Sequence, residues 1–123
     1  MLESPSRLSA TLVINGFLQI HYHWVYEAKP QEGLLLIGDD AKNGIVTASW
    51  VDSFHQSKRV MFCQGVPLAN GVSVKGTYPA GEGPDWGWRI DLEHTAAGLS
   101  LTMYNISPDE QTYLAVRAEH VRA

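Results

Sequence analysis

The chain is short of cysteine, of basic residues and of long apolar runs, and each shortage excludes a class of protein. A single cysteine, Cys63, rules out an intrachain disulfide, and its apolar surroundings predict a buried, inert thiol. Nine Lys and Arg against thirteen Asp and Glu give a net charge of -4, with no basic stripe for nucleic acid or an anionic membrane. Neither a signal peptide nor a membrane-spanning run is found. We therefore expect a soluble, cytoplasmic protein that binds no nucleic acid and no membrane.

Motifs that commonly carry catalysis or cofactor binding are also missing. The sequence contains no Gly-x-Gly-x-x-Gly, phosphate loop, paired-cysteine site or Gly-x-Ser-x-Gly elbow. Its acidic pairs, at 39–40 and 109–110, fall in turns, where solvated carboxylates are common. The sequence therefore favours a protein without a cofactor and without catalysis.

What the chain does have is alternation of apolar and polar residues in short segments. Residues 17–28 show it best, because Leu18, Ile20, Tyr22 and Trp24 would share one side of a strand. Turn residues interrupt the pattern, with Pro and Gly at 29–33 and a hairpin signal at Asn43-Gly44. Further strands are predicted at 34–38, 45–55, 58–65, 72–78, 86–94, 99–106 and 112–121, with part of another at 4–12.

These segments predict one all-β domain covering residues 1–123. About nine strands, with turns every eight to twelve residues or so, are typical of an antiparallel meander β-barrel of about 8–10 strands. A barrel of this size is either filled by its own side chains or holds one small ligand. Trp24, Trp50 and Trp88 lie on three different strands, so they could form the aromatic wall of a cavity or simply the core.

A series of local features resembles one known family. A turn acid is followed ten residues later by a Trp within a Trp-x-x-Ser-like strand, and single Gly and Arg residues occur in later strands. The residues that carry the likeness are Asp40, Trp50, Asp52, Ser53, Gly65, Arg89 and Arg117. Over about residues 16–122 the chain resembles the domain of unknown function 1579 family, which is similar to calycins, the lipocalin and fatty-acid-binding-protein group of β-barrels. The resemblance implies a calycin-like barrel.

The chain departs from the family pattern in two places. Asp39 stands before the turn acid where family members usually carry an aromatic residue, and the family's first strand, with its Gly-x-Trp start, is missing. A barrel short of a strand has an open edge, and open edges tend to be covered or paired with another copy. We therefore expect a homodimer.

The stretch at 48–57 raises the question of a catalytic triad, since it contains Asp52, Ser53 and His55. Alternation along a strand places Ser53 and His55 on one face and Asp52 on the other, beside Trp50. Asp52 then cannot orient His55, as a triad requires. We interpret Ser53 and His55 as part of a polar strand face.

Two other groups could carry chemistry. His21 and His23 project the same way and would need a third ligand, from His55, His94 or His120, to hold zinc; two solvated histidines are the simpler interpretation. An inward Arg89 or Arg117 could bind a ligand carboxylate. If Trp88 faces inward, however, Arg89 faces out and pairs with an acid such as Glu119.

Three hypotheses for function follow. The first is a barrel that binds a small hydrophobic or amphipathic molecule without catalysis, with Trp24, Trp50 and Trp88 as apolar contacts and His55 or Tyr104 as polar ones. The second is a haem-binding or enzymatic site on the same barrel. The third is a structural or interaction protein whose barrel is filled.

Overall fold

The structure, a computed structural model, describes residues 7–53, 59–79, 81–96 and 98–121 of the 123-residue chain. It contains nine β-strands: β1 (Arg7–Val13), β2 (Phe17–Tyr26), β3 (Lys29–Asp40), β4 (Ile45–Asp52), β5 (Met61–Leu68), β6 (Gly71–Tyr78), β7 (Trp86–Thr95), β8 (Gly98–Ile106) and β9 (Thr112–Val121). They form one antiparallel sheet in which each strand pairs with the next along the chain. The predicted all-β meander is confirmed.

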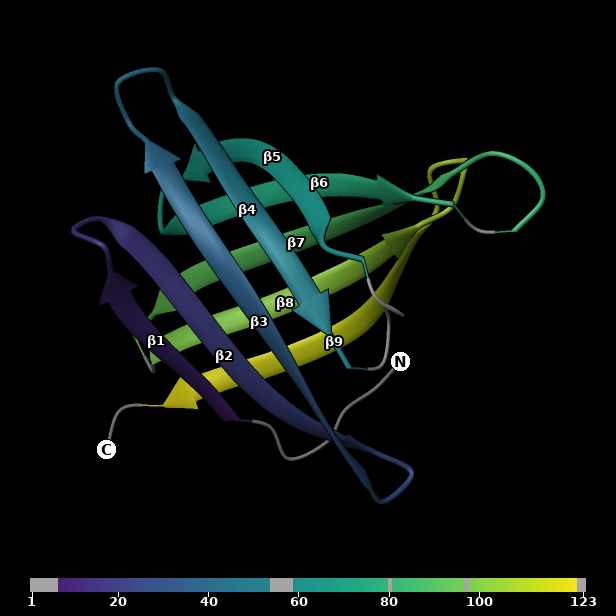
Figure 1. Ribbon diagram of the computed structural model, residues 1–123, viewed down its shortest axis with the longest axis horizontal. Helices are drawn as coiled ribbons and strands as arrows, with labels where there is room; N and C mark the ends of the chain where they lie inside the picture. The colour runs from purple at the N-terminus through teal and green to yellow at the C-terminus, as the bar shows by residue number, and fades with distance from the viewer. Residues whose placement is uncertain (1–6, 54–58, 80, 97, 122–123) are drawn as a thin grey trace.

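The sheet coils into a nearly closed barrel (Figure 1), because its first and last strands come together. β1 hydrogen-bonds to β2 and β9 to β8, while β1 and β9 contact each other across a seam. The open edge that the missing family strand led us to expect is therefore covered by the chain itself. The argument for a homodimer that rested on that edge no longer holds.

The two ends of the barrel differ in the strands that meet there. At one end, called here the tryptophan end, β4, β6 and β8 finish and β5, β7 and β9 begin. The turns after β1, β3, β5 and β7 lie at the opposite end. The predicted Asn43-Gly44 turn belongs to this opposite end. There Gly44 has a φ of 67°, and Asn43 Nδ2 donates a hydrogen bond of 2.8 Å to Asp40 Oδ2.

The interior is filled by the inward side of the alternating strands. Its fully buried side chains are Ile20, Tyr22, Leu35, Val46, Trp50, Cys63, Val74, Ile90, Leu101, Met103 and Val116. The sides predicted for residues 17–28 and 86–94 are correct, since Trp24, Trp88 and Leu92 are also buried. Close packing of this kind leaves room for a ligand only towards the ends of the barrel.

The turn expected at 29–33 is wrong, because that stretch is the first part of β3. The chain instead reverses at Glu27 and Ala28, whose φ angles of 49° and 65° match a two-residue hairpin turn. Pro30 pairs only with β2, because the pairing of β3 with β4 stops at Gly33. Among the described strands, none on the β4 side therefore needs an N–H from Pro30, and the proline is tolerated. The hairpin of β2 and β3 extends well past the rest of the barrel (Figure 1).

Gly65, one of the residues shared with the family pattern, marks a close approach between strands. A Cβ at this position would clash with the backbone carbonyl of Ser73 on β6. Only glycine allows β5 and β6 to pass so closely, so Gly65 shapes the barrel wall.

Within the part of the chain that the structure describes, no helix is long and apolar enough to cross a membrane.

Candidate functional site

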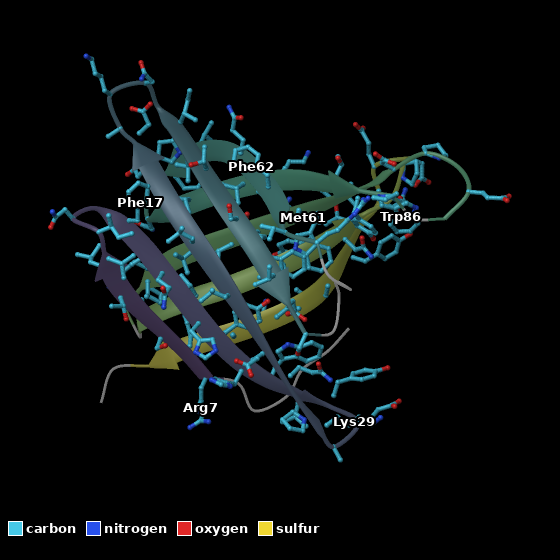
Figure 2. The ribbon with its side chains drawn as sticks, viewed as in Figure 1. Arg7, Phe17, Lys29, Met61, Phe62 and Trp86 are labelled. Atoms are coloured by element: carbon cyan, nitrogen blue, oxygen red, sulfur yellow. The ribbon has the colours of Figure 1, made fainter. Side chains whose placement is uncertain are left out.

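A pocket of about 480 Å³ opens at the tryptophan end of the barrel. Its lining comes from five strands, β4 to β8, and the segments beside them: Trp50, Arg59, Val60, Met61, Phe62, Thr77, Tyr78, Pro79, Trp88 and Asn105. Met61 is the partner of Trp50 in the β4–β5 pairing, and Asn105 is the partner of Trp88 in the β7–β8 pairing. Figure 2 shows Met61 and Phe62 close together at the start of β5.

Two indole rings form the floor of this pocket. Trp50 on β4 and Trp88 on β7 stack with ring centroids 4.8 Å apart and an interplanar angle of 16°. Since β5 and β6 separate these strands in the sheet, the rings meet across the barrel interior. Trp50 and Trp88 are only 1% and 2% exposed, so the floor offers little accessible surface. Val60 and Phe62 at the rim are 65% and 61% exposed. The rim offers most of the accessible apolar surface.

A polar pair stands beside the indoles. Tyr78 at the end of β6 donates a hydrogen bond of 2.5 Å from its hydroxyl to Asn105 Oδ1 on β8. The Tyr78 ring also meets Trp88 edge on, with centroids 6.5 Å apart. Both polar side chains are half-buried and line the pocket, so they can offer hydrogen bonds to a bound molecule.

Beneath the floor lies a buried hydrogen-bonded chain that fixes the position of Trp50. The indole Nε1 donates to the Tyr22 hydroxyl at 2.8 Å, and that hydroxyl donates to Asp52 Oδ2 at 2.6 Å. Burial, the charge of Asp52 and the hydrogen bond to it raise the pKa of Tyr22 well above its usual value. Trp50 and Asp52, two of the residues that carry the family resemblance, therefore connect β4 to β2 through the Tyr22 hydroxyl.

Space for the Tyr22 ring comes from a glycine on the neighbouring strand. Gly33 pairs with Tyr22 on one side and with Asp52 on the other. A Cβ at Gly33 would overlap the phenol ring and its hydroxyl. The absence of a side chain there lets the Tyr22 hydroxyl reach Asp52.

The structure separates two members of the triad as alternation predicted. Asp52 is buried in the interior, while Ser53 is exposed. The Ser53 hydroxyl donates to Gln31 Oε1 at 2.7 Å and accepts a hydrogen bond from the Glu32 amide at 2.9 Å. These contacts tie the end of β4 to β3. His55 lies outside the described residues.

His21 and His23 lie on the outer side of β2, with their rings 4.5 Å apart. His21 Nε2 pairs with Glu32 Oε1 at 2.8 Å. Of the other candidates, His94 is exposed at the opposite end of the barrel. Among the side chains that the structure describes, no group of three or more His, Cys, Asp and Glu could hold a metal ion.

Arg89 and Tyr104 are partners on neighbouring strands, and both face away from the interior. The Arg89 guanidinium lies 4.2 Å from the centroid of the Tyr104 ring, and its Nε is 3.3 Å from Asp91 Oδ2. The outward placement of Arg89 is as predicted, and the acid it pairs with is Asp91. The side chain of Glu119 lies outside the described part of the structure. Tyr104 does not face the interior, so it cannot serve as a polar contact there. Arg117 is exposed on β9.

Of the three tryptophans predicted to contact one ligand, Trp50 and Trp88 line the pocket and Trp24 does not. Trp24 is buried near Tyr26, with ring centroids 6.2 Å apart, and it does not line the pocket. Sequence reasoning missed Tyr78 and Asn105, which the structure brings together. Alternation alone would have given Tyr78 the inward side of β6, and it would have given Asn105, two residues after the buried Met103, the inward side of β8. That the two side chains meet depends on the curvature of the sheet.

A second pocket, of about 420 Å³, lies at the opposite end of the barrel. It is lined mainly by apolar side chains, including Leu18, Ile37, Val72, Leu92 and Leu99. No Phe, Tyr or Trp is among its lining residues in the described part of the chain. The pocket at the tryptophan end, with its stacked rings and polar pair, is therefore the better candidate for specific binding.

Comparison of the chain with protein-family models, with curated proteins and with solved structures gave no match.

Proposed function

We propose that this protein binds a small hydrophobic or amphipathic molecule at the tryptophan end of its barrel and has no catalytic activity. The observation that carries the proposal is the pocket of about 480 Å³ above the stacked pair of Trp50 and Trp88. Ligand pockets are commonly 300–1,000 Å³ or so, mostly apolar, with a few polar groups that fix orientation.

The lining suggests how such a molecule would lie. Its apolar part would rest on the edges of the two indoles and against Val60. A neutral polar group would exchange hydrogen bonds with Tyr78 and Asn105, and an acidic group would meet Arg59 at the rim. The preferred ligand is thus amphipathic, with an apolar body and one polar head.

Other parts of the proposal rest on the sequence. We assign the chain to the domain of unknown function 1579 family on the strength of Asp40, Trp50, Asp52 and Gly65, and we place it in the cytoplasm. His55 stays a proposed polar contact. The nine-stranded meander and the structural roles of Asp40, Asp52 and Gly65 are compatible with a calycin-like barrel.

Haem binding or an enzymatic site is the weaker candidate. His21 and His23 face outward, and His94 lies at the other end of the barrel, so the described histidines stand away from the proposed pocket. A purely structural role would require that nothing binds above the indoles. Addition of haem, followed by a visible absorption spectrum, tests the first alternative; no Soret shift is expected.

Tryptophan fluorescence tests the proposed pocket. Native mass spectrometry of the purified protein would first reveal a co-purified ligand, and a panel of fatty acids and flat aromatic acids would then be titrated. Binding should change the emission of the wild-type protein. The response should be much smaller in Trp88→Phe, because Trp88 lines the pocket together with Trp50, and should be kept in Trp24→Phe, because Trp24 does not line it.

A silent titration together with no bound mass would overturn the proposed function. A response that survives Trp88→Phe but disappears in Trp24→Phe would instead move the site away from this end. Circular dichroism of both variants shows whether each has folded.

A further inference from the structure

The outer surface of β2 to β5 lacks charge over three consecutive cross-strand rows. The strand pairings define these rows, which we call the β2–β5 face: Phe17, Gly38, Thr47 and Gln64; Gln19, Leu36, Ser49 and Phe62; His21, Leu34 and Val51. None of these eleven residues is Asp, Glu, Lys or Arg. Glu32, which pairs with His21, stands at the border.

Large apolar side chains on this face are open to solvent. Phe17 is 43% exposed, Leu34 38%, Leu36 39% and Phe62 61%. Figure 2 shows Phe17 and Phe62 flanking β3 and β4. The Phe17 ring lies beside Gly38, where a Cβ would be 3.3 Å from ring atom Cε1. An exposed apolar area of this kind marks an interaction site.

The outer surface of β6 to β9 has the opposite character. It carries Lys75 on β6, Arg89, Asp91 and Glu93 on β7, and Arg117 on β9. Outward charged side chains thus occur on three of these four strands, as is usual for a surface that stays in solution. The contrast shows that the β2–β5 face is not simply an average part of the surface.

We propose that the β2–β5 face is the interface of a homodimer, formed by two copies related by a twofold axis. In such an interface the same patch meets itself, so any charge near the axis would face a like charge. A face without charges avoids this repulsion between like charges. A face that binds a different protein could carry charges, because its partner can neutralise them.

The size of the face suits this role. Four strands about 4.8 Å apart and five residues long cover roughly 300 Å² in projection. That is about the apolar centre of a standard interface, which buries about 800 Å² on each partner once its polar rim is included. Val66, 55% exposed on β5, and Glu32 lie where the rim would form.

Sedimentation velocity and light scattering at increasing concentration test the proposal. The wild-type protein should reach a mass of about 27 kDa, twice the 13.6 kDa of the chain. Leu36→Lys places one positive charge in the middle row of each copy, so two like charges would meet in the dimer. The dissociation constant of the dimer should therefore rise by at least about 100-fold. Phe62→Lys should act in the same direction.

Val25→Lys is the matched control, because Val25 is also 39% exposed on the outer side of β2 but lies outside the three rows. It should leave the dimer intact. A wild-type protein that is monomeric at every concentration would overturn the proposal. So would a dimer that survives both Leu36→Lys and Phe62→Lys, since its interface would then lie elsewhere. Either result leaves the ligand proposal untouched, because that proposal is scored by fluorescence.

Discussion

The hydroxyl of Tyr22 donates a hydrogen bond of 2.6 Å to the carboxylate of Asp52 inside the barrel, although the two residues are 30 positions apart. The same hydroxyl accepts a hydrogen bond from Trp50, whose ring forms the floor of the proposed pocket. Stability and the shape of the site therefore depend on one phenol group.

Removing that hydroxyl should destabilise the protein. Tyr22→Phe takes one hydrogen-bond partner from a buried carboxylate and another from the Trp50 indole, so we expect a loss of about 2 kcal/mol in the free energy of unfolding. Urea denaturation measures it. Tyr104→Phe, on the outer surface, should change stability by less than about 0.5 kcal/mol. Equal losses in the two variants would mean that the buried chain of hydrogen bonds contributes little.

Adding a single methyl group next to Tyr22 should also be severe. In Gly33→Ala the new Cβ overlaps the Tyr22 ring, which must move away from Asp52, and we expect a loss of about 3 kcal/mol. Gly38→Ala on the same strand is the control, because its Cβ would meet only side chains, at 3.1 Å or more. Thermal unfolding of both variants checks the difference. A Gly33→Ala protein as stable as Gly38→Ala would contradict the packing described here.

The Tyr22 hydroxyl should make stability fall at alkaline pH. Below a pH of about 10 the phenol is protonated in both the folded and the unfolded protein, so its contribution is constant. Above that pH the unfolded chain releases a proton that the folded protein keeps, because the folded pKa is raised. The advantage of wild type over Tyr22→Phe should therefore shrink as pH rises past 10. Denaturation at several alkaline pH values measures it, and a constant difference would count against the raised pKa.

Cys63 should be unreactive in the folded protein. Its side chain is fully buried, and burial raises the pKa of the thiol from 9.0 to about 11, so little thiolate forms at neutral pH. We expect a chromogenic disulfide reagent to react only as fast as the protein unfolds, and at once in denaturant. Rapid modification without denaturant would show that the barrel opens near β5.

The polar pair should matter for amphipathic ligands only. Tyr78→Phe removes the hydroxyl that bonds Asn105 and faces the proposed site, so affinity for a ligand with a polar head should fall about five- to tenfold. Binding of a wholly apolar ligand should hardly change. Calorimetric titration compares the two ligands, with Tyr104→Phe as control. An equal effect on both ligands would mean that Tyr78 acts through packing.

Several parts of the fold could be predicted from local patterns. Alternation gave the inward side of β2 and β7, including Trp24, Trp88 and Leu92. It also separated Asp52 from Ser53, which removed the local triad. The Asn43-Gly44 turn was correct because a hairpin turn is decided by the residues within it.

Other parts could not be predicted, because they depend on where strands end relative to one another. The turn at Glu27 and Ala28 carries no Gly or Asn, and Pro30 is allowed only because β4 stops short of it. Tyr104, expected to be a polar contact inside the barrel, faces outward because it pairs with the outward Arg89 on the neighbouring strand.

The sequence by itself determined that this chain forms an antiparallel barrel and which side of β2 and β7 turns inward, because both follow from a two-residue period along each strand. Only the tertiary structure decided that Trp50 stacks on Trp88, that Tyr22 reaches Asp52, and that three uncharged rows lie side by side on the outer wall. These contacts join residues far apart in the chain, and the curvature and register of the closed sheet bring them together.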